Sequence, residues 1–238
     1  VVLSNNDGCV VARSAEAKCL GVKSGTPFYQ LRQLFPNVRI EAFSSNYELY
    51  GEITGRVMTI IRDMAPQCFR YSIDEAFAIL DGFSVEQLKE WGEELHRRVL
   101  QSVGMPLTIG IAPTKTLAKM ASHFAKKYAG YNHCCVIDTD DRRLKAAALY
   151  QIGEVWGIGR RYAARLEAYG IRTAYDFAAH SYSWVRATFK TVVVERTWAE
   201  LNGTDCVPDD LPAKKKSICT SRSFSGMVRD FDTLRTHV

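Results

Sequence analysis

The stretch that decides how this sequence is interpreted is Tyr71-Ser72-Ile73-Asp74-Glu75-Ala76-Phe77-Ala78-Ile79-Leu80. Two adjacent acids, Asp74 and Glu75, interrupt an otherwise apolar and β-prone run. Burying two like charges is costly unless a cation compensates them. Mg²⁺ is a hard cation that takes carboxylate oxygens and substrate phosphates as ligands. The pair therefore indicates phosphoryl transfer, and the alternative is a strand end whose acids simply face solvent.

The geometry of a strand narrows this interpretation. Neighbouring side chains on a regular strand point to opposite faces, so Asp74 and Glu75 could share an ion only at a turn or a bulge. The residues on either side, 67–72 and 76–81, each have the pattern of a strand. We therefore predict a β-hairpin with the two carboxylates at or beside its tip, which is a common position for functional side chains.

The overall composition is that of a globular protein. Of the 238 residues, 47% are hydrophobic and 24% are charged, which suits one large domain or a few small ones. The sequence contains neither an apolar run long enough to span a bilayer nor a signal peptide, so we expect a cytoplasmic protein with no membrane partner. Its seven cysteines form no CxxC pair and no zinc-site spacing, so we expect reduced thiols.

The positive charge is concentrated in the later part of the chain. Residues 142–200 hold ten basic and five acidic side chains, so the net charge of this segment equals the formal net charge of the whole chain, +5. A basic segment beside a neutral one suggests a polyanion docked on that segment. A solvated helical surface explains the charge equally well.

Strand and helix patterns alternate in the first part of the chain. Thr26 and Pro27 are predicted as the N-cap and first residue of a helix that ends before Pro36, and Ser45 with Glu48 as a capping box. Further helices are expected at 13–20, after Ser45 as far as Met64, after Ser84 and at 114–127, with strands at 1–3, 40–43, 107–112 and 134–138. This order predicts an α+β sheet with helices on one face. Residues 142–201 are predicted to be entirely helical, 202–216 to form a linker and 217–224 to begin a new β element.

The predicted helix at 114–127 has two distinct faces. At about 100° per residue, three lysines fall on one face and the apolar residues on the other. We call the residues Lys115, Lys119 and Lys126 the lysine face. Beside a metal-binding carboxylate pair, this face is a plausible clamp for a triphosphate. The alternative is a solvated amphipathic helix.

A second motif, Trp156-Gly157-Ile158-Gly159, is predicted to connect two helices. Its glycines allow backbone N–H groups to approach a phosphate, and a helix N-terminus adds positive potential. Arg160 and Arg161 follow directly. The pattern is typical of a helix-hairpin-helix that holds the nucleic-acid backbone without reading its sequence. A plain αα-hairpin that uses glycine for tight packing is the alternative.

These motifs occur in an order that resembles the Y-family (translesion) DNA polymerases, and within them the UmuC branch, the catalytic subunits of bacterial DNA polymerase V. Ser72-Ile73-Asp74-Glu75-Ala76 marks the family. The runs at 3–13 and 43–50, which contain Asn5-Asn6-Asp7-Gly8 and Ser45-Asn46-Tyr47-Glu48-Leu49-Tyr50, point to the UmuC branch. The segments at 15–18, 115–119 and 155–161 also match, so the resemblance covers nearly the whole chain.

The resemblance implies a right-hand polymerase architecture: a palm sheet, fingers, an all-α helix-hairpin-helix thumb and the start of a little-finger domain. The expected ranges are 1–45 for N-terminally truncated fingers, 46–140 for the palm, 141–205 for the thumb, 206–216 for a linker and 217–238 for the little finger. The implied function is error-prone translesion synthesis in DNA repair and SOS mutagenesis. The implied substrates are primer-template DNA and deoxynucleoside triphosphates, and the implied partners are a processed UmuD-like subunit, a RecA filament and the sliding clamp. The protein would associate with the bacterial nucleoid when acting.

The resemblance also implies roles for individual residues. Asp74 would be a metal ligand and Glu75 a metal ligand and the catalytic carboxylate, with two Mg²⁺ ions in the full-length protein. The expected nucleotide contacts are Lys126, Lys18, Arg13, Cys9 and Val11, of which Cys9 and Val11 would roof the nascent base pair. The expected DNA contacts are Gly157, Gly159, Arg160, Arg161, Lys115 and Lys119.

The sequence departs from many relatives in two ways. Ala15 and Lys18 stand where those relatives carry a Tyr and an Arg that hold the triphosphate. The family's first metal-binding Asp and its aromatic steric gate would lie before Val1, so we expect a fragment of a longer protein. Because two metals about 3.5–4 Å apart normally need a third carboxylate, we expect this fragment to be inactive on its own.

Two other functions remain open from the sequence. One is a non-catalytic nucleic-acid scaffold on a degenerate polymerase fold, against which Asp74, Glu75 and Lys126 argue. The other is a nucleotide cyclase, which shares paired acids on a palm-like sheet. A cyclase has no need of a helix-hairpin-helix or a basic segment.

Overall fold

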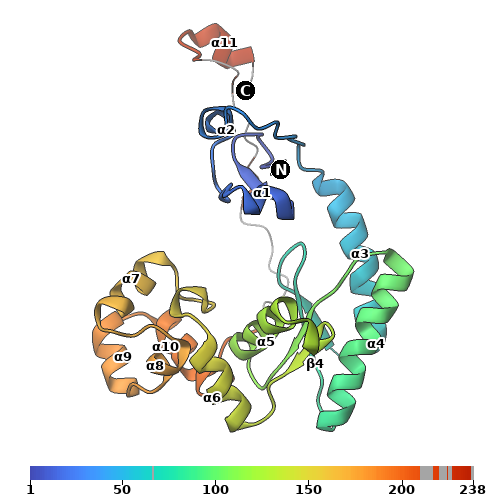
Figure 1. Cartoon of the computed structure of the whole chain (residues 1–238), viewed down its shortest axis with the longest axis vertical. Coiled ribbons are helices and arrows are strands. Elements are labelled where there is room, and N and C mark those ends of the chain that lie inside the picture. Colours follow the sequence, from blue (N-terminus) through green and yellow to red (C-terminus); the bar gives the residue numbers. More distant parts are fainter. Residues whose placement is uncertain (66, 210–216, 220–223, 225–226, 237–238) are drawn as a thin grey trace. The chain divides into compact units, whose positions relative to one another are not determined.

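The computed structural model describes residues 1–65, 67–209, 217–219, 224 and 227–236. The chain forms two compact units (Figure 1). The first comprises Val1–Glu52 and Ala213–Val238, and the second comprises Ile53–Pro212. No helix among the described residues is both long and apolar enough to cross a membrane.

The first unit is built around a small antiparallel pair, β1 (Val2–Leu3) and β2 (Val10–Ala12). Two short helices follow, α1 (Ala15–Cys19) and α2 (Phe28–Leu34), and α11 (Phe231–Thr236) belongs to the same unit. The expected strand at 1–3 and helix at 13–20 are confirmed in shortened form. The core of this unit consists of Leu3, Val10, Ala17, Val22 and Leu31.

Two predictions in the first unit are wrong in detail. The helix predicted to begin at Pro27 begins at Phe28, with Pro27 as its N-cap. Thr26 does not cap it, because the Thr26 carbonyl accepts the N–H of Val10 at 2.9 Å and its hydroxyl bonds to the Lys23 carbonyl at 2.8 Å. The strand expected at 40–43 is reduced to a single bridge between Phe43 and Val2.

The long helix α3 (Tyr47–Met64) is confirmed, but its cap differs from the prediction. Asn46, not Ser45, caps it by accepting the Leu49 N–H at 3.1 Å. Met58 and Ile61 are its buried residues. Val57, Ile60 and Met64 are half-buried beside them, whereas Tyr47 and Tyr50 are exposed.

The carboxylate hairpin is confirmed. Strands β3 (Gln67–Arg70) and β4 (Ala76–Ile79) pair antiparallel, with Gln67 opposite Ile79 and Arg70 opposite Ala76. This register leaves residues 71–75 as the connecting loop. Both predicted acids therefore lie in the loop at the tip, next to the first residue of β4.

The remainder of the sheet region is a parallel pair with a helix on each face. Helix α4 (Val85–Val103) is the helix expected after Ser84, and it begins with a capping box formed by Ser84 and Gln87. It is followed by β5 (Ile109–Ile111), α5 (Lys115–Lys127), the short 3₁₀ helix η1 (Ala129–Tyr131) and β6 (Cys134–Val136). A Cβ added to Gly92 of α4 would meet the Cys134 sulfur of β6 at 2.3 Å, and one added to Gly110 of β5 would meet the backbone of α5 at 2.0 Å.

The prediction that helices cover one face is therefore wrong for this pair. Strands β5 and β6 are parallel, so the chain must cross over between them, and the crossover helix α5 covers one face. The preceding helix α4 packs on the other face, where Leu95 and Val99 contribute to the core together with Ile109 and Cys134.

Residues 140–201 form a helical lobe, as predicted for 142–201 (Figure 1). It contains α6 (Asp140–Leu149), the 3₁₀ turn η2 (Ile152–Glu154), α7 (Arg160–Ala168), α8 (Ala174–Ala178), α9 (Tyr182–Phe189) and α10 (Val192–Leu201). Its core is continuous with the apolar face of α5, so Leu117 and Phe124 lie in one cluster with Leu166, Phe177 and Val194. The predicted apolar face of α5 is confirmed.

The C-terminal predictions fall mostly outside the described residues. The β element expected at 217–224, where the little finger would begin, can be checked only at 217–219 and 224, and these residues form no strand. Of the linker expected at 206–216, residues 206–209 are described.

Candidate active site

The tip of the β3–β4 hairpin is fixed by short hydrogen bonds. The Glu75 carbonyl accepts the N–H groups of Tyr71 and Ser72 at 3.0 and 3.1 Å. The hydroxyl of Ser72 donates to Asp74 Oδ1 at 2.7 Å, and the guanidinium of Arg70 donates to the Ser72 carbonyl at 3.1 Å. The backbone of the loop is therefore tied to itself, and the two carboxylates are presented from a defined turn.

Asp74 and Glu75 line the same groove, which has a volume of about 1210 Å³. The helix α5 contributes Lys115, Lys119 and Lys126 to its lining. The structure thus brings together the carboxylate pair and the whole lysine face, as the sequence predicts. A groove with adjacent carboxylates and several ammonium groups suits a ligand that carries both a divalent cation and phosphates.

The three lysines of the lysine face have different environments. Lys126 is exposed. The Lys119 ammonium lies 2.7 Å from Glu75 Oε1 and is 21% exposed. Lys115 is 15% exposed and forms an ion pair with Asp209 at 3.0 Å. The alternative of a uniformly solvated helix face is therefore wrong for two of the three.

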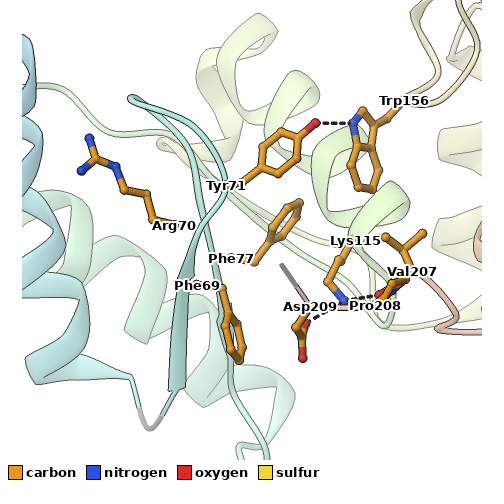
Figure 2. Close-up of a pocket in the computed structure, with 9 residues that line it drawn as sticks. All are labelled: Phe69, Arg70, Tyr71, Phe77, Lys115, Trp156, Val207, Pro208 and Asp209. Atoms are coloured by element: carbon orange, nitrogen blue, oxygen red, sulfur yellow. Dashed lines mark hydrogen bonds and ion pairs between the residues drawn. The ribbon is translucent and has the colours of Figure 1, made fainter. Parts of the chain in front are cut away.

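An aromatic cluster, defined here as Tyr71, Phe77 and Trp156, lies beside Lys119. The Tyr71 ring is 5.6 Å from the Phe77 ring and 5.5 Å from the Trp156 ring, measured between centroids. The indole N–H of Trp156 donates to the Tyr71 hydroxyl at 3.1 Å (Figure 2). This contact joins the hairpin loop to the segment that carries the Gly157–Gly159 motif.

Residues 205–209 form a strap that is held by Lys115. The Lys115 ammonium donates to the Val207 carbonyl at 2.8 Å and pairs with Asp209 (Figure 2). It also pairs with Asp205 at 3.6 Å. Burial lowers the pKa of Lys115, but the hydrogen bond that its ammonium donates to Asp209 and the negative charge of Asp205 outweigh this effect, so the pKa is raised. Lys115, an expected DNA contact, is engaged with this strap.

The sequence analysis missed Glu200, a fully buried acid on α10. Its Oε2 accepts the Thr116 N–H at 2.8 Å, and its Oε1 accepts the N–H groups of Cys206 and Val207 at 3.1 Å each. The Thr114 hydroxyl, which caps α5, donates to the Glu200 carbonyl at 3.0 Å. Glu200 therefore fixes the N-terminus of α5 and the strap to α10.

Two opposing effects act on this carboxyl. Burial raises the pKa of Glu200, but the three backbone N–H groups favour the charged form more strongly, so the pKa is lowered. The sequence contained one signal for this role. Val194, Thr197 and Leu201 recur at helical spacing on the buried face of α10, and Glu200 falls on that face as the acid that needs donors.

The Gly157–Gly159 motif begins α7. Gly157 has a φ of 91°, and a Cβ added there would lie 2.2 Å from the Thr197 hydroxyl oxygen. Gly159 is the N-cap of α7 and has open space around it, and Arg160 and Arg161 are exposed beside it. The element before the motif is the 3₁₀ turn η2, where the prediction had a helix. The two glycines therefore have different roles. Gly157 allows close packing against Thr197, and Gly159 leaves the N-terminus of α7 accessible.

The expected nucleotide contacts Cys9, Val11, Arg13 and Lys18 all lie in the first unit. Val11 is 45% exposed on β2 and Lys18 is exposed on α1, whereas Cys9 is half-buried. The guanidinium of Arg13 donates to the Val22 carbonyl at 3.0 Å. Arg13 therefore links two segments of its own unit through this hydrogen bond.

The donor chemistry of the hairpin tip suits a hard divalent cation. The two adjacent carboxylates supply oxygen ligands, and the ammonium of Lys119 already occupies a cation position against Glu75. Among the described residues, no group of three or more His, Cys, Asp or Glu side chains is placed to hold a metal. The tip therefore offers two carboxylate ligands, Asp74 and Glu75.

Comparisons with known proteins identify the family and the fold of this chain. The family model described as the impB/mucB/samB family matches residues 1–123. Protein UmuC of Salmonella typhimurium is 43% identical over all of this chain and 57% of its own length, and DNA polymerase IV of Dehalococcoides mccartyi is 28% identical over 94% of this chain and 56% of its own length. This chain thus spans little more than half the length of these relatives.

Solved structures show the same fold. An insertion ternary complex of Dbh DNA polymerase aligns with a TM-score of 0.69 and 22% identity, covering 87% of this chain and 61% of the other. DinB from Sulfolobus solfataricus aligns with a TM-score of 0.69 and 24% identity, covering 88% and 61%. The expected α+β polymerase fold is confirmed. With its UmuC-like sequence and this fold, the chain belongs to the impB/mucB/samB family.

Proposed function

We propose that this chain is part of an error-prone translesion DNA polymerase of the UmuC branch, which extends a primer on damaged template DNA. Membership of the impB/mucB/samB family, the likeness to proteins named UmuC and DNA polymerase IV, and the polymerase fold support this function. The observation that carries it is the Asp74–Glu75 pair at a hairpin tip, in one groove with the lysine face.

The residues of the groove have complementary tasks in nucleotidyl transfer. Asp74 and Glu75 would hold divalent cations, proposed to be two Mg²⁺ in the full-length protein. Bound there, the cations would lower the pKa of the primer 3′-hydroxyl and neutralise charge on the phosphates. Lys126, exposed on the rim of the groove, would bind the triphosphate as a point charge. The hairpin loop fixes the backbone of Glu75, whose carbonyl accepts the N–H groups of Tyr71 and Ser72.

The Gly157–Gly159 motif would bind the DNA backbone. Gly159 leaves the first turn of α7 accessible to a phosphate, and Arg160 and Arg161 add charge next to it. Such contacts carry no base specificity, which suits a polymerase that must accept damaged templates. Lys119 and Lys115 lie in the same unit and would contact DNA only after leaving their present ion-pair partners.

The remaining parts of the proposal follow from the resemblance. We propose that residues 1–45 serve as fingers, 46–140 as palm, 141–205 as thumb, 206–216 as linker and 217–238 as the start of a little finger. Cys9 and Val11 would roof the nascent base pair, with Arg13 and Lys18 near the triphosphate. A UmuD-like subunit, a RecA filament and the sliding clamp are the proposed partners.

Primer extension with the full-length gene product tests this function. Asp74→Asn and Glu75→Gln should abolish extension of a primer opposite an abasic site and still bind primer-template DNA in an anisotropy titration. Asp141→Asn, which removes an exposed acid of α6, is the matched control and should extend normally. Extension that survives both active-site substitutions would contradict the proposal. If the unsubstituted protein binds DNA but never extends it, a non-catalytic scaffold becomes the better assignment.

A further inference from the structure

Among the described lysines of the groove, Lys119 is the one that contacts an expected metal ligand. Its ammonium lies 2.7 Å from Glu75 Oε1, and its side chain is less exposed than that of its partner, 21% against 50%. Lys115, four residues earlier on α5, is bound to the strap instead. The neighbouring acid Asp74 accepts its short hydrogen bond from the hydroxyl of Ser72.

The aromatic cluster gives the Lys119 ammonium a defined position. The nitrogen lies 4.6 Å from the ring centroid of Tyr71, 5.4 Å from that of Trp156 and 5.9 Å from that of Phe77. Aromatic faces attract cations at these distances. The rings are themselves fixed, because the Trp156 indole donates to the Tyr71 hydroxyl and the two rings pack edge to face. The ammonium can therefore lose Glu75 and still keep a favourable site beside the rings.

We propose that Lys119 is a positioning residue, a built-in counter-ion of Glu75 that a divalent cation must displace in order to bind. This inference rests on the proposed function, because it takes Asp74 and Glu75 as the metal ligands. A cation coordinated by Glu75 and the ammonium 2.7 Å from the same oxygen repel each other, so both cannot keep their positions. Metal binding therefore includes the cost of breaking the Lys119–Glu75 ion pair.

The displacement favours a cation that arrives with phosphates over a cation alone. An ammonium that has lost Glu75 binds a phosphate oxygen well as a charge-assisted donor. A metal–triphosphate complex supplies that oxygen, whereas a free metal ion does not. Lys119 thus makes the site favour a metal–nucleotide complex over a free metal ion. Until the complex binds, the ammonium compensates the charge of Glu75 on the hairpin tip.

Binding of Mn²⁺ alone to the full-length gene product, measured by electron paramagnetic resonance, tests the proposal. Lys119→Met should tighten Mn²⁺ binding roughly tenfold, because the competing positive charge is gone. Lys119→Gln should tighten it similarly, which guards against a folding defect of one variant. Lys127→Met, which removes an exposed lysine at the end of α5, is the matched control and should leave the Mn²⁺ affinity unchanged.

The fluorescence of Trp156 supplies an independent measurement. Titration with Mg²⁺ should change the emission of the unsubstituted protein as the ammonium moves at the aromatic cluster. The change should be absent in Lys119→Met and in Trp156→Phe, which identifies the tryptophan responsible. Unchanged or weaker Mn²⁺ binding in both Lys119 variants would overturn the counter-ion role and leave the polymerase proposal standing. Mn²⁺ binding that is insensitive to Glu75→Gln would overturn the metal assignment itself, and the counter-ion role with it.

Discussion

The buried carboxylate of Glu200 should be one of the larger single contributors to the stability of the second unit. We consider Glu200→Gln, which preserves the shape of the side chain and removes its charge. The carboxylate accepts N–H groups from Thr116, Cys206 and Val207 at 2.8–3.1 Å. An amide has one oxygen, so its NH₂ group must face at least one of these donors.

The cost of this substitution can be estimated from its parts. Each buried donor left without an acceptor costs about 1–3 kcal/mol. The hydrogen bonds that survive lose their charge assistance, which is about half their strength. We therefore expect Glu200→Gln to lower the free energy of unfolding by about 2–4 kcal/mol. With a urea m-value of about 2–3 kcal/mol/M, the unfolding midpoint should fall by about 1 M.

Urea unfolding of the full-length product, followed by circular dichroism, measures this shift. Glu195→Gln is the matched control, because Glu195 lies on the same helix, is only partly buried and bonds to the exposed Tyr182 hydroxyl. Its free energy of unfolding should change by less than about 0.5 kcal/mol. Equal midpoints for the two variants would refute the reasoning.

The pH dependence of the free energy of unfolding tests the role of Glu200 a second time, because the direction of the expected change is fixed by the direction of its pKa shift. In the folded state the pKa of Glu200 is lowered from its ordinary value of 4.5, because three backbone N–H groups stabilise the carboxylate. Its contribution to stability is therefore present above pH 4.5 and is lost as the pH falls through the folded-state pKa. The difference in unfolding free energy between the unsubstituted protein and Glu200→Gln should shrink on acidification. A difference that grows toward low pH would contradict the assignment.

Three further predictions follow from other positions. Gly157→Ala should lower the midpoint of thermal unfolding by several degrees, because the φ of Gly157 is 91° and the new Cβ would lie 2.2 Å from the Thr197 hydroxyl oxygen. Gly159→Ala is the control and should change the midpoint little, because the space around Gly159 is open. Equal shifts for the two variants would exclude the packing role of Gly157. Arg160→Ala and Arg161→Ala should each weaken DNA binding regardless of sequence and reduce the slope of log K against log salt by about 1, whereas a sequence-dependent loss would point to base contacts. Burial raises the pKa of the Cys134 thiol to about 11, so iodoacetamide at pH 8 should alkylate the exposed Cys19 well before Cys134. Peptide mass spectrometry measures the two alkylation rates, and comparable rates would contradict the burial of Cys134.

The sequence predicted those features that depend on short-range periodicity. The hairpin at residues 67–79 was readable because two β-prone runs flank a polar turn, and the two faces of α5 because lysines and apolar residues recur at helical spacing. The carboxylate pair was found for the same local reason. Cap assignments failed where tertiary contacts intervene: Thr26 pairs with Val10, so the helix begins later than its sequence suggests.

What could not be predicted depends on contacts between distant segments. Glu200 is 84 residues from Thr116, and nothing near it in the sequence supplies the donors that make its burial possible. The Lys119–Glu75 pair spans 44 residues, and the Trp156–Tyr71 hydrogen bond spans 85. Periodicity placed Lys119 on the polar face of α5 but could not indicate which carboxylate or ring its ammonium would meet.

The helix α5 links stability to the chemistry of the groove. Its apolar face belongs to the core of the helical lobe, through Leu117 and Phe124, and its N-terminus is fixed by Glu200. Its opposite face carries the ammonium that neutralises Glu75. Because the interior of a protein is close-packed, α5 cannot rotate to move one face without disturbing the other. The position of Lys119 against the carboxylate pair is therefore set by packing in the lobe, and Lys119 can respond to a cation only through its own side-chain torsions. The aromatic cluster lies close enough to hold the ammonium both when it pairs with Glu75 and after it has left Glu75. A small movement of the side chain is therefore sufficient to free the carboxylate.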